Sequence, residues 1–573
     1  MEQFPEFVDL LLARRKDCDS LWVSRPMIPL LPHKLSPESK YTRKQMIQAV
    51  LNNEKVKSTI TSLAAMYKLD TNKVRKEAHM MVNEMAAKAH LATVRWLGTR
   101  SRSLKSIVPK FGLLSTILES LLEGGVPDIH FIPISINYER PPEELLFVYE
   151  LLGVPKPKES TTGLLRSLSI LQKPYAYGCV YFSIGEPISA CQFLSMEHRK
   201  ARVLSPYTKL SSSVNERLGY CIIDSHKKNT ILMPFNVVAL LFNERSQIYP
   251  DDPYTLDVLV DDYLWCKNLL HTFDATIHTN RPVDINNTNT SEIKEEILNT
   301  LKPHEELLVF DESKLLKLRG RHRATKLKNN MCVKGHTLSE KTMQIAVSVI
   351  NISLYLNPTL SFLIKPAIAT VLIGMKGVEI GAAFKRYILL RTLLSTEFAM
   401  PLIEDESVIK SEWNETLNLL LSKNYISIQN NTYIQGQNTK VFSLLHNVIL
   451  PFIDAIYITC LVLFEWDESK SNYITIKVVL IEAQKRVEKA FREGSTWGKH
   501  PYTLSLDLFN TTINNLIAQG ILVPNERPNT YQADKIRLES ILVQLQSLSL
   551  KRPVGSYYNM ILSALLPAVQ AKL

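Results

Sequence analysis

Residues 98–140 have the sequence GTRSRSLKSIVPKFGLLSTILESLLEGGVPDIHFIPISINYER, and this stretch decides what the sequence predicts about the fold. The apolar residues of 111–122 share one helical face: Phe111, Leu114, Ile117, Leu118, Leu121 and Leu122. Gly124-Gly125 then end the predicted helix. The run HFIPISI at 130–136 predicts a buried strand. Helix followed by strand indicates an α/β sheet fragment.

The chain downstream extends this pattern. Pro141-Pro142-Glu143-Glu144 predicts the start of a short helix that ends at Gly153. A turn-rich stretch and another helix lead to a strand at Cys179–Ile184. We therefore predict a mainly α fold with an α/β portion: a helical N-terminal region at 1–97, a partial α/β domain at 98–190, and a large helical C-terminal domain at 191–573.

The two flanking regions carry helical patterns of their own. Residues 41–97 have a one-sided apolar stripe, and Asp70 is a plausible N-cap within them. In the C-terminal region, residues 415–428 and 511–524 each predict a helix that runs into a short strand. This similarity is too weak to indicate a repeat.

Composition excludes several classes of protein. The 573 residues are 45% hydrophobic, which excludes wholesale disorder. The seven cysteines are odd in number and widely spaced, which excludes a disulfide framework and a cysteine-rich zinc site and fits a reducing compartment. Acidic residues near the start, with no long apolar core, argue against a signal peptide.

Two long apolar stretches could be mistaken for membrane spans. Residues 343–373 and 444–464 are both interrupted by prolines and polar or charged residues. We predict that both are buried helices, because a span needs about 20 predominantly apolar residues. A re-entrant or peripheral membrane contact stays open.

The net charge of +11 is concentrated in two basic stretches. Residues 95–110 hold five basic residues and no acid, and residues 314–328 hold seven and no acid. The second stretch fits a helix or loop against anionic lipid headgroups, or a solvated loop. Nucleic-acid binding predicts aromatic residues among the charges, and 314–328 contains none, so we expect no nucleic-acid partner.

The first basic stretch contains the clearest chemical motif, Gly98-Thr99-Arg100-Ser101-Arg102. Arginine can bind a phosphate through two hydrogen bonds, and glycine lets the backbone approach it. The alternative is a solvated basic loop. The chain has no P-loop, no G-x-G-x-x-G, no H-E-x-x-H and no G-x-S-x-G motif.

These residues resemble a known family. Gly98–Arg102 resembles the third signature block of the glycerol-3-phosphate/dihydroxyacetone-phosphate acyltransferase family. The sequence IPISINYER at 132–140 resembles the fourth block of that family, and YELLGVPKPKESTTGLL at 149–165 resembles the stretch that follows it. The match is densest at 98–190, which the resemblance identifies as a partial acyltransferase domain, and closest to the dihydroxyacetone-phosphate acyltransferases.

The resemblance implies a chemistry and its residues. The family transfers an acyl group from acyl-CoA to the hydroxyl of dihydroxyacetone phosphate, the first step of peroxisomal ether-lipid synthesis. Gly98–Arg102 would bind the substrate phosphate, and Pro133, Ile134 and Ser135 would line the acceptor or acyl pocket. Acyl-CoA is a co-substrate, and we expect no metal ion and no other cofactor.

The sequence departs from the family at the catalytic base. The family takes its base from a His-x-x-x-x-Asp block, and none of the 13 histidines here is followed by Asp five positions on. The nearest imitation, His79 with Glu84, lies about 140° apart around a helix. Leu97 also replaces the Glu that precedes the third block. We therefore name no catalytic residue, and interpret the chain as an internally shortened form whose own catalysis is impaired.

The resemblance also implies a location and partners. The chain ends in Ala571-Lys572-Leu573, which is similar to the S-K-L peroxisomal targeting tripeptide. We expect a location at the luminal face of the peroxisomal membrane with peripheral membrane contact, binding to the import receptor, and alkyl-dihydroxyacetone-phosphate synthase as a further partner. The alternative is a non-catalytic protein that binds or regulates the full-length acyltransferase.

Overall fold

The computed structural model describes residues 51–52, 54–67, 70–76, 78–79, 101–122, 128–155, 177–198, 212–248, 252–278, 290–319, 338–403, 405–466, 474–493 and 497–550. The chain forms two compact units, Met1–Arg95 and Trp96–Leu573. The first unit contains helix α3 (Glu54–Tyr67) and a further helical stretch at 71–76. The Asp70 carboxylate accepts a hydrogen bond from the Asn72 amide at 3.2 Å, which confirms the predicted N-cap.

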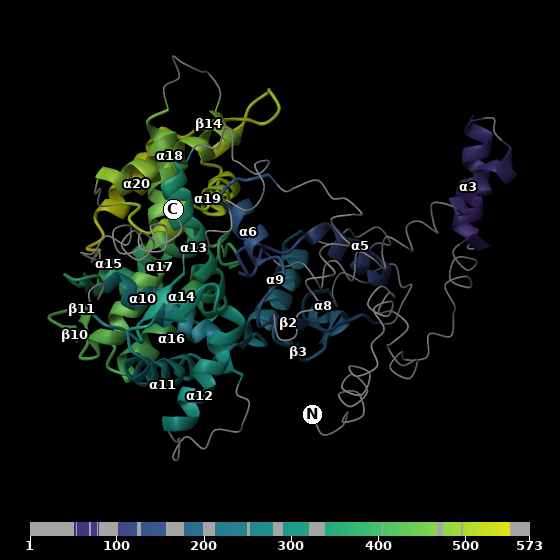
Figure 1. The fold of residues 1–573 in the computed structure, drawn as a ribbon. Helices are drawn as coiled ribbons and strands as arrows, with labels where there is room; N and C mark the ends of the chain where they lie inside the picture. Colours follow the sequence, from purple (N-terminus) through teal and green to yellow (C-terminus); the bar gives the residue numbers. More distant parts are fainter. Residues whose placement is uncertain are drawn as a thin grey trace, which may run out of the picture. The chain divides into compact units, whose positions relative to one another are not determined.

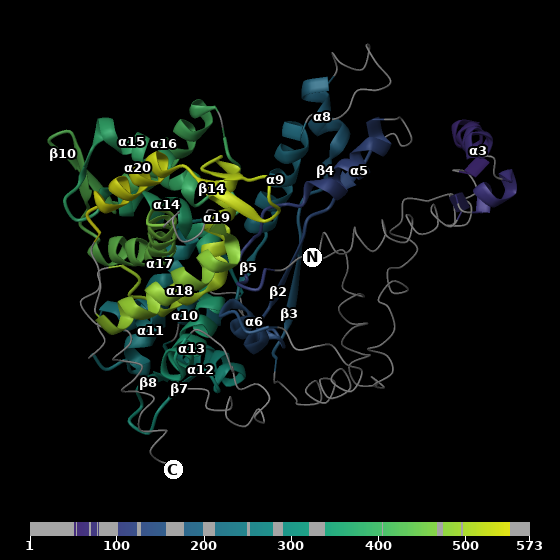
Figure 2. The ribbon, with the colours of Figure 1, turned by 90° about the horizontal axis from the view of Figure 1, so that it is seen from above.

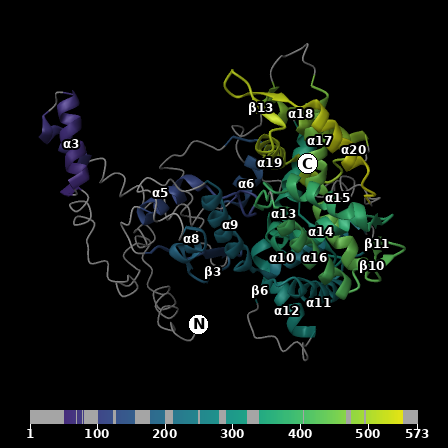
Figure 3. The same cartoon turned by 180° about the vertical axis from the view of Figure 1, so that it is seen from behind.

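The second unit begins with the elements predicted around residues 111–190. Helix α5 (Phe111–Leu122) has the predicted bounds. Its buried residues Leu114, Leu118 and Leu121 form a small core with helices α8 (Ala190–His198) and α9 (Ser212–Lys228), a group that Figure 3 shows from behind. The one-sided apolar pattern thus selects both the helix and the face that it buries.

The predicted strand at 130–136 is divided in two. Strand β1 (His130–Phe131) pairs with β4 (Ile188–Ser189), and β2 (Ile134–Tyr138) pairs with β3 (Val180–Ile184), both antiparallel. Pro133 stands at the break, where its ring nitrogen has no hydrogen to donate to a ladder. The prediction of one continuous buried strand was therefore wrong, whereas the strand predicted at 179–184 is confirmed.

The β2–β3 sheet has one polar face and one apolar face. Ser135 of β2 is buried, whereas Val180, Phe182 and Ile184 of β3 are 45%, 55% and 71% exposed. These three residues alternate along the strand, so they share a face. The three side chains of β3 therefore form an exposed apolar patch.

Helix α6 (Glu144–Leu151) connects this region to the helical body. It is followed by Gly153 at φ 93°, a left-handed conformation that favours glycine, as the sequence predicts. The buried Glu144 carboxylate accepts hydrogen bonds from Arg140 and from the Tyr355 hydroxyl of helix α13 (Glu340–Leu356). The side chains Val148, Leu151 and Leu152 join the main hydrophobic core.

The two long apolar stretches form the centre of that core. Residues Thr342–Ile373 span α13, the short 3-10 helix η5 (Asn357–Thr359) and α14 (Leu360–Ile373), and Thr439–Phe464 is helix α17. Both are long and apolar enough to cross a membrane, but 83% and 89% of their most apolar windows are buried inside the fold. Figures 1 and 2 show α17 surrounded by other helices, as predicted for a core helix.

Two segments of the helical domain share one connectivity. The first runs β9 (Val378–Glu379), α15 (Ile380–Leu393), α16 (Glu406–Ser422), β10 (Ile426–Gln429) and β11 (Thr432–Gln435). The second runs β12 (Ile474–Thr475), α18 (Ile476–Glu493), α19 (Leu506–Ala518), β13 (Leu522–Pro524) and β14 (Thr530–Ala533), with the 3-10 helix η6 (Pro501–Leu504) between its helices. The sheet orders, β10-β11-β9 and β13-β14-β12, match. The weak similarity of 415–428 and 511–524 thus marks a structural repeat.

The remaining elements complete the helical domain. They are β5 (Ile231–Leu232), α10 (Pro234–Ile248), α11 (Leu256–Thr272), β6 (Thr276–Ile277), α12 (Thr290–Leu301), the 3-10 helix η3 (Lys302–His304), β7 (Leu308–Phe310), β8 (Leu316–Leu318) and α20 (Lys535–Gln546). The described part of the second basic stretch, residues 314–319, contains strand β8, whose Lys317 pairs with Asp311 at 2.5 Å. A helix or loop was expected there, so the strand corrects that part of the prediction.

Candidate functional site

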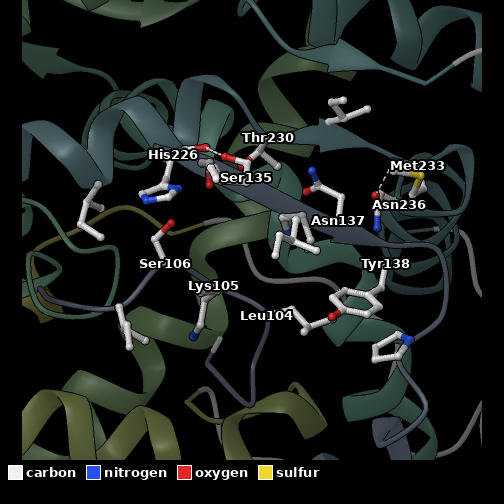
Figure 4. Close-up of a pocket in the computed structure, with 18 of the residues that line it drawn as sticks. Leu104, Lys105, Ser106, Ser135, Asn137, Tyr138, His226, Thr230, Met233 and Asn236 are labelled. Atoms are coloured by element: carbon white, nitrogen blue, oxygen red, sulfur yellow. Dashed lines mark hydrogen bonds between the residues drawn. The ribbon is translucent and has the colours of Figure 1, made fainter. Parts of the chain in front are cut away.

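A cavity of about 260 Å³ lies where the predicted site segments meet the helical domain (Figure 4). Its walls come from residues 104–110, from β2, and from helices α9, α10, α13 and α14. The following polar side chains line it: Lys105, Ser106, Lys110, Ser135, Asn137, Tyr138, His226, Thr230, Asn236, Tyr355 and Ser361. The cavity therefore lies between the segment that follows the third block-like motif and the strand within the fourth.

The predicted phosphate-binding residues lie at the edge of the described region. Gly98, Thr99 and Arg100 are outside the described residues. The Arg102 guanidinium is 2.5 Å from the Glu150 carboxylate, and its side chain is 62% exposed and does not line the cavity. The Ser101 hydroxyl accepts a hydrogen bond from the Lys105 amide at 2.9 Å. Ser101 thus shapes the turn that brings Lys105 to the cavity.

Two of the three predicted acceptor-pocket residues line the cavity, and the third does not. Ile134 and Ser135 line the cavity, and the Ser135 hydroxyl donates to the His226 carbonyl at 3.0 Å. Pro133 is buried outside the lining, and its carbonyl accepts a hydrogen bond from the Gly185 amide at 2.8 Å. Ser135 therefore fixes the position of α9 relative to β2.

A buried ion pair holds the 101–105 turn against the helical domain. The Lys105 ammonium bonds the Glu397 carboxylate, and their side chains are 5% and 8% exposed. The ammonium also lies 4.8 Å from the centre of the Phe452 ring. Burial lowers the pKa of Lys105 to about 8, and the nearby Asp507 carboxylate opposes this shift. The lysine therefore stays charged at neutral pH.

Further hydrogen bonds extend this contact over several helices. The Ser103 hydroxyl donates to Asp507 at 3.2 Å, and the Asn357 amide donates to the Ser103 carbonyl at 2.7 Å. The Thr511 hydroxyl donates to the second oxygen of the Glu397 carboxylate. The turn is thus fixed by groups that lie between about 250 and 400 residues away in the sequence.

Asn137 of β2 has an unsatisfied donor at the cavity. Its Nδ2 atom is buried and has no hydrogen-bond partner among the residues that the structure describes. A buried donor left without a partner costs about 1–3 kcal/mol. Because Asn137 lines the cavity, a ligand oxygen could satisfy this donor.

Within the described part of the chain, His226 is the one histidine among the residues that line this cavity. It lies in the last turn of α9, and its carbonyl accepts hydrogen bonds from Ser135 and from the Thr230 hydroxyl. Burial lowers the pKa of the imidazole, which favours the neutral ring. The sequence does not single out His226, because no Asp stands five positions after it.

The other sequence predictions of site residues have no counterpart at the cavity. His79 belongs to the first unit, and Glu84 lies outside the described residues. Ala571, Lys572 and Leu573 also lie outside them. The described residues contain no group of three or more His, Cys, Asp or Glu side chains that could hold a metal ion.

Comparison with known proteins gives a family match and several relatives. The model of the glycerol-3-phosphate acyltransferase C-terminal region matches residues 147–525. Dihydroxyacetone phosphate acyltransferase from Oryctolagus cuniculus is 26% identical over 453 residues, which cover 76% of this chain and 60% of that protein. The protein of the same name from Homo sapiens is 38% identical over 184 residues, or 31% of this chain and 26% of the relative.

A further relative is named for a related acceptor, glycerol-3-phosphate. A probable mitochondrial glycerol-3-phosphate acyltransferase from Caenorhabditis elegans is 36% identical over 128 residues, 21% of this chain and 17% of that protein. The chain thus spans at most about 60% of the length of the relatives described here.

Proposed function

This chain belongs to the family of the glycerol-3-phosphate acyltransferase C-terminal region, and from that premise we propose that it binds dihydroxyacetone phosphate and acyl-CoA at the cavity between residues 104–110 and β2. In this proposal residues 98–190 are a partial acyltransferase domain. Acyl-CoA is the co-substrate, and no metal or other cofactor takes part.

One observation carries the proposal. The unsatisfied Asn137 donor lies in a cavity of about 260 Å³, large enough for a three-carbon phosphate, next to the segment that follows Arg100 and Arg102. A ligand oxygen would complete the hydrogen bonding of Asn137, and Arg100, to which the family resemblance assigns phosphate binding, would neutralise the phosphate. The names of the relatives support this acceptor and acyl donor.

We further propose that acyl transfer by this chain is slow. No His-x-x-x-x-Asp block supplies the general base that the family uses. Loss of general-base help alone reduces a rate by about 100- to 10,000-fold. The proposed activity is therefore substrate binding with impaired turnover in ether-lipid synthesis.

Isothermal titration calorimetry of the full chain with dihydroxyacetone phosphate tests the binding site. Asn137→Ala should weaken binding up to about tenfold, because one hydrogen bond to the ligand is lost. Arg100→Ala should weaken it more, because an arginine–phosphate contact is lost. Asn299→Ala, an exposed site on α12, should leave the affinity unchanged. Equal affinity of Asn137→Ala and the parent chain would refute the site.

The uncovered face of β3 favours a second candidate function, in which the chain binds the full-length acyltransferase. Val180, Phe182 and Ile184 present an apolar surface that a partner could cover. Phe182→Asp should abolish co-purification with a full-length dihydroxyacetone phosphate acyltransferase. Ile536→Asp, at an 80% exposed residue of α20, should not. Co-purification that survives Phe182→Asp would exclude this surface.

The location of the chain is a separate proposal. Ala571–Leu573 would bind the peroxisomal import receptor and direct the chain to the luminal face of the membrane, where alkyl-dihydroxyacetone-phosphate synthase would be a further partner. Deletion of these three residues should leave a fluorescently tagged chain in the cytosol. Unchanged peroxisomal import of the deletion variant would contradict the address.

A further inference from the structure

The cavity contains a histidine that could replace the base missing from the sequence. We propose that His226 acts as the general base for residual acyl transfer from acyl-CoA to the acceptor hydroxyl, an inference that rests on the proposed substrate binding. His226 lies in helix α9, outside both block-like motifs of the sequence.

The position of His226 is fixed by the fold. The Ser135 hydroxyl donates to its carbonyl at 3.0 Å and the Thr230 hydroxyl at 2.9 Å, so β2 and the end of α9 hold its backbone. Figure 4 shows its side chain at the cavity, whose lining also includes Ser106, Asn137 and Tyr138. No hydrogen bond or ion pair to the imidazole is found among the described residues.

The surroundings of His226 favour a neutral imidazole. Burial disfavours the charged imidazolium and so lowers the pKa of His226. The titratable groups that line the cavity with His226 are Lys105, Lys110, Tyr138 and Tyr355, and those within four residues of it on α9 are Asp224, Lys227 and Lys228. Lys105 pairs with Glu397, Lys227 with Asp224, and Tyr355 with Glu144. His226 is therefore the group best suited to accept a proton at neutral pH.

The proposed reaction conserves atoms and charge. An imidazole nitrogen of His226 takes the proton of the acceptor hydroxyl while the hydroxyl oxygen bonds to the thioester carbonyl carbon. The carbon–sulfur bond then breaks, and the CoA thiolate takes the proton from the imidazolium. The products are an ester and CoA thiol. The buried Asn137 Nδ2 is a candidate donor to an oxygen of the bound substrates.

The test measures both binding and transfer with the full purified chain, dihydroxyacetone phosphate and palmitoyl-CoA. The parent chain should release CoA thiol slowly and form the ester, at a rate that rises with pH up to about 7. His226→Gln should lower this rate by 100-fold or more with less than a threefold change in the dissociation constant for dihydroxyacetone phosphate. His271→Gln, an exposed histidine of α11, should have the parent rate.

Chemical rescue separates a base from a structural residue. Added imidazole should restore part of the rate of His226→Ala in a concentration-dependent way, which a residue needed only for packing would not allow. Equal rates of the parent chain and His226→Gln would overturn the inference. Binding of dihydroxyacetone phosphate without any transfer would also overturn it and leave the proposed binding function intact, whereas no binding at all would overturn both.

Discussion

The buried Lys105–Glu397 ion pair should be one of the strongest single constraints on the candidate site. Its side chains are 5% and 8% exposed, and they connect the 101–105 turn to the helical domain. Lys105→Met removes the cation and leaves the Glu397 carboxylate buried without it. Breaking a buried pair in this way costs about 3–5 kcal/mol, because one charge is left uncompensated. Glu397→Gln should cost a similar amount for the same reason.

A double-mutant cycle isolates the energy of this pair. The combined Lys105→Met, Glu397→Gln chain carries no unpaired charge, so its loss of stability should be at least about 2 kcal/mol smaller than the sum of the single losses. The assay is urea unfolding of the four chains at pH 7, followed by circular dichroism. Lys317→Met is the matched control, since Lys317 and Asp311 are 50% and 24% exposed and such a pair contributes less than about 1 kcal/mol.

Two outcomes would refute the reasoning. One is a loss below about 1 kcal/mol for Lys105→Met, which would mean that water or another group compensates Glu397. The other is strict additivity of the two single losses in the double variant, which would show that the two side chains do not interact energetically.

Three further predictions concern the fold. Burial lowers the pKa of His500 to about 3, so below about pH 6.5 the unfolded chain binds a proton at this residue while the folded chain does not. The free energy of unfolding should therefore fall by about 2 kcal/mol between pH 7 and 5. In urea titrations His500→Gln should remove this loss, and His271→Gln should retain it. Gly153→Ala, at φ 93°, should destabilise the chain by about 1 kcal/mol in the same assay, and an unchanged midpoint would contradict the left-handed conformation. Leu118 is fully buried between α5 and α9, so Leu118→Ala should lower the free energy of unfolding by about 2–5 kcal/mol. A loss below about 1 kcal/mol would show that the small core can close the space left by the removed side chain.

The sequence predicted the helices and strands whose residue pattern lies within one short segment of the chain. Helix α5 has its predicted bounds because six apolar residues define one face and two glycines follow. Strand β3 and the glycine stop after α6 were also predicted. The division of 130–136 was missed, although Pro133 was visible, because an apolar run alone does not show which amides must pair.

The contacts that build the candidate site could not be predicted in this way. Lys105 and Glu397 are 292 residues apart, and neither residue carries a sequence signal for the other. The sequence predicted the strand at 179–184 but not that its apolar side chains Val180, Phe182 and Ile184 are exposed. His226 and Asn137 converge on the cavity only through the packing of α9 against β2. Such long-range contacts depend on the whole fold.

The structure limits which residues of the first basic stretch can bind an anion. Among the residues of this stretch that the structure describes, Arg102 pairs with Glu150 and Lys105 pairs with Glu397. Lys105 therefore serves to hold the turn rather than to attract an anion from solution. Because Glu397 and Asp507 come from the helical domain, that domain forms part of the site and is more than an appendage to it. A substitution at Glu397 should consequently weaken ligand binding although it lies outside both block-like motifs.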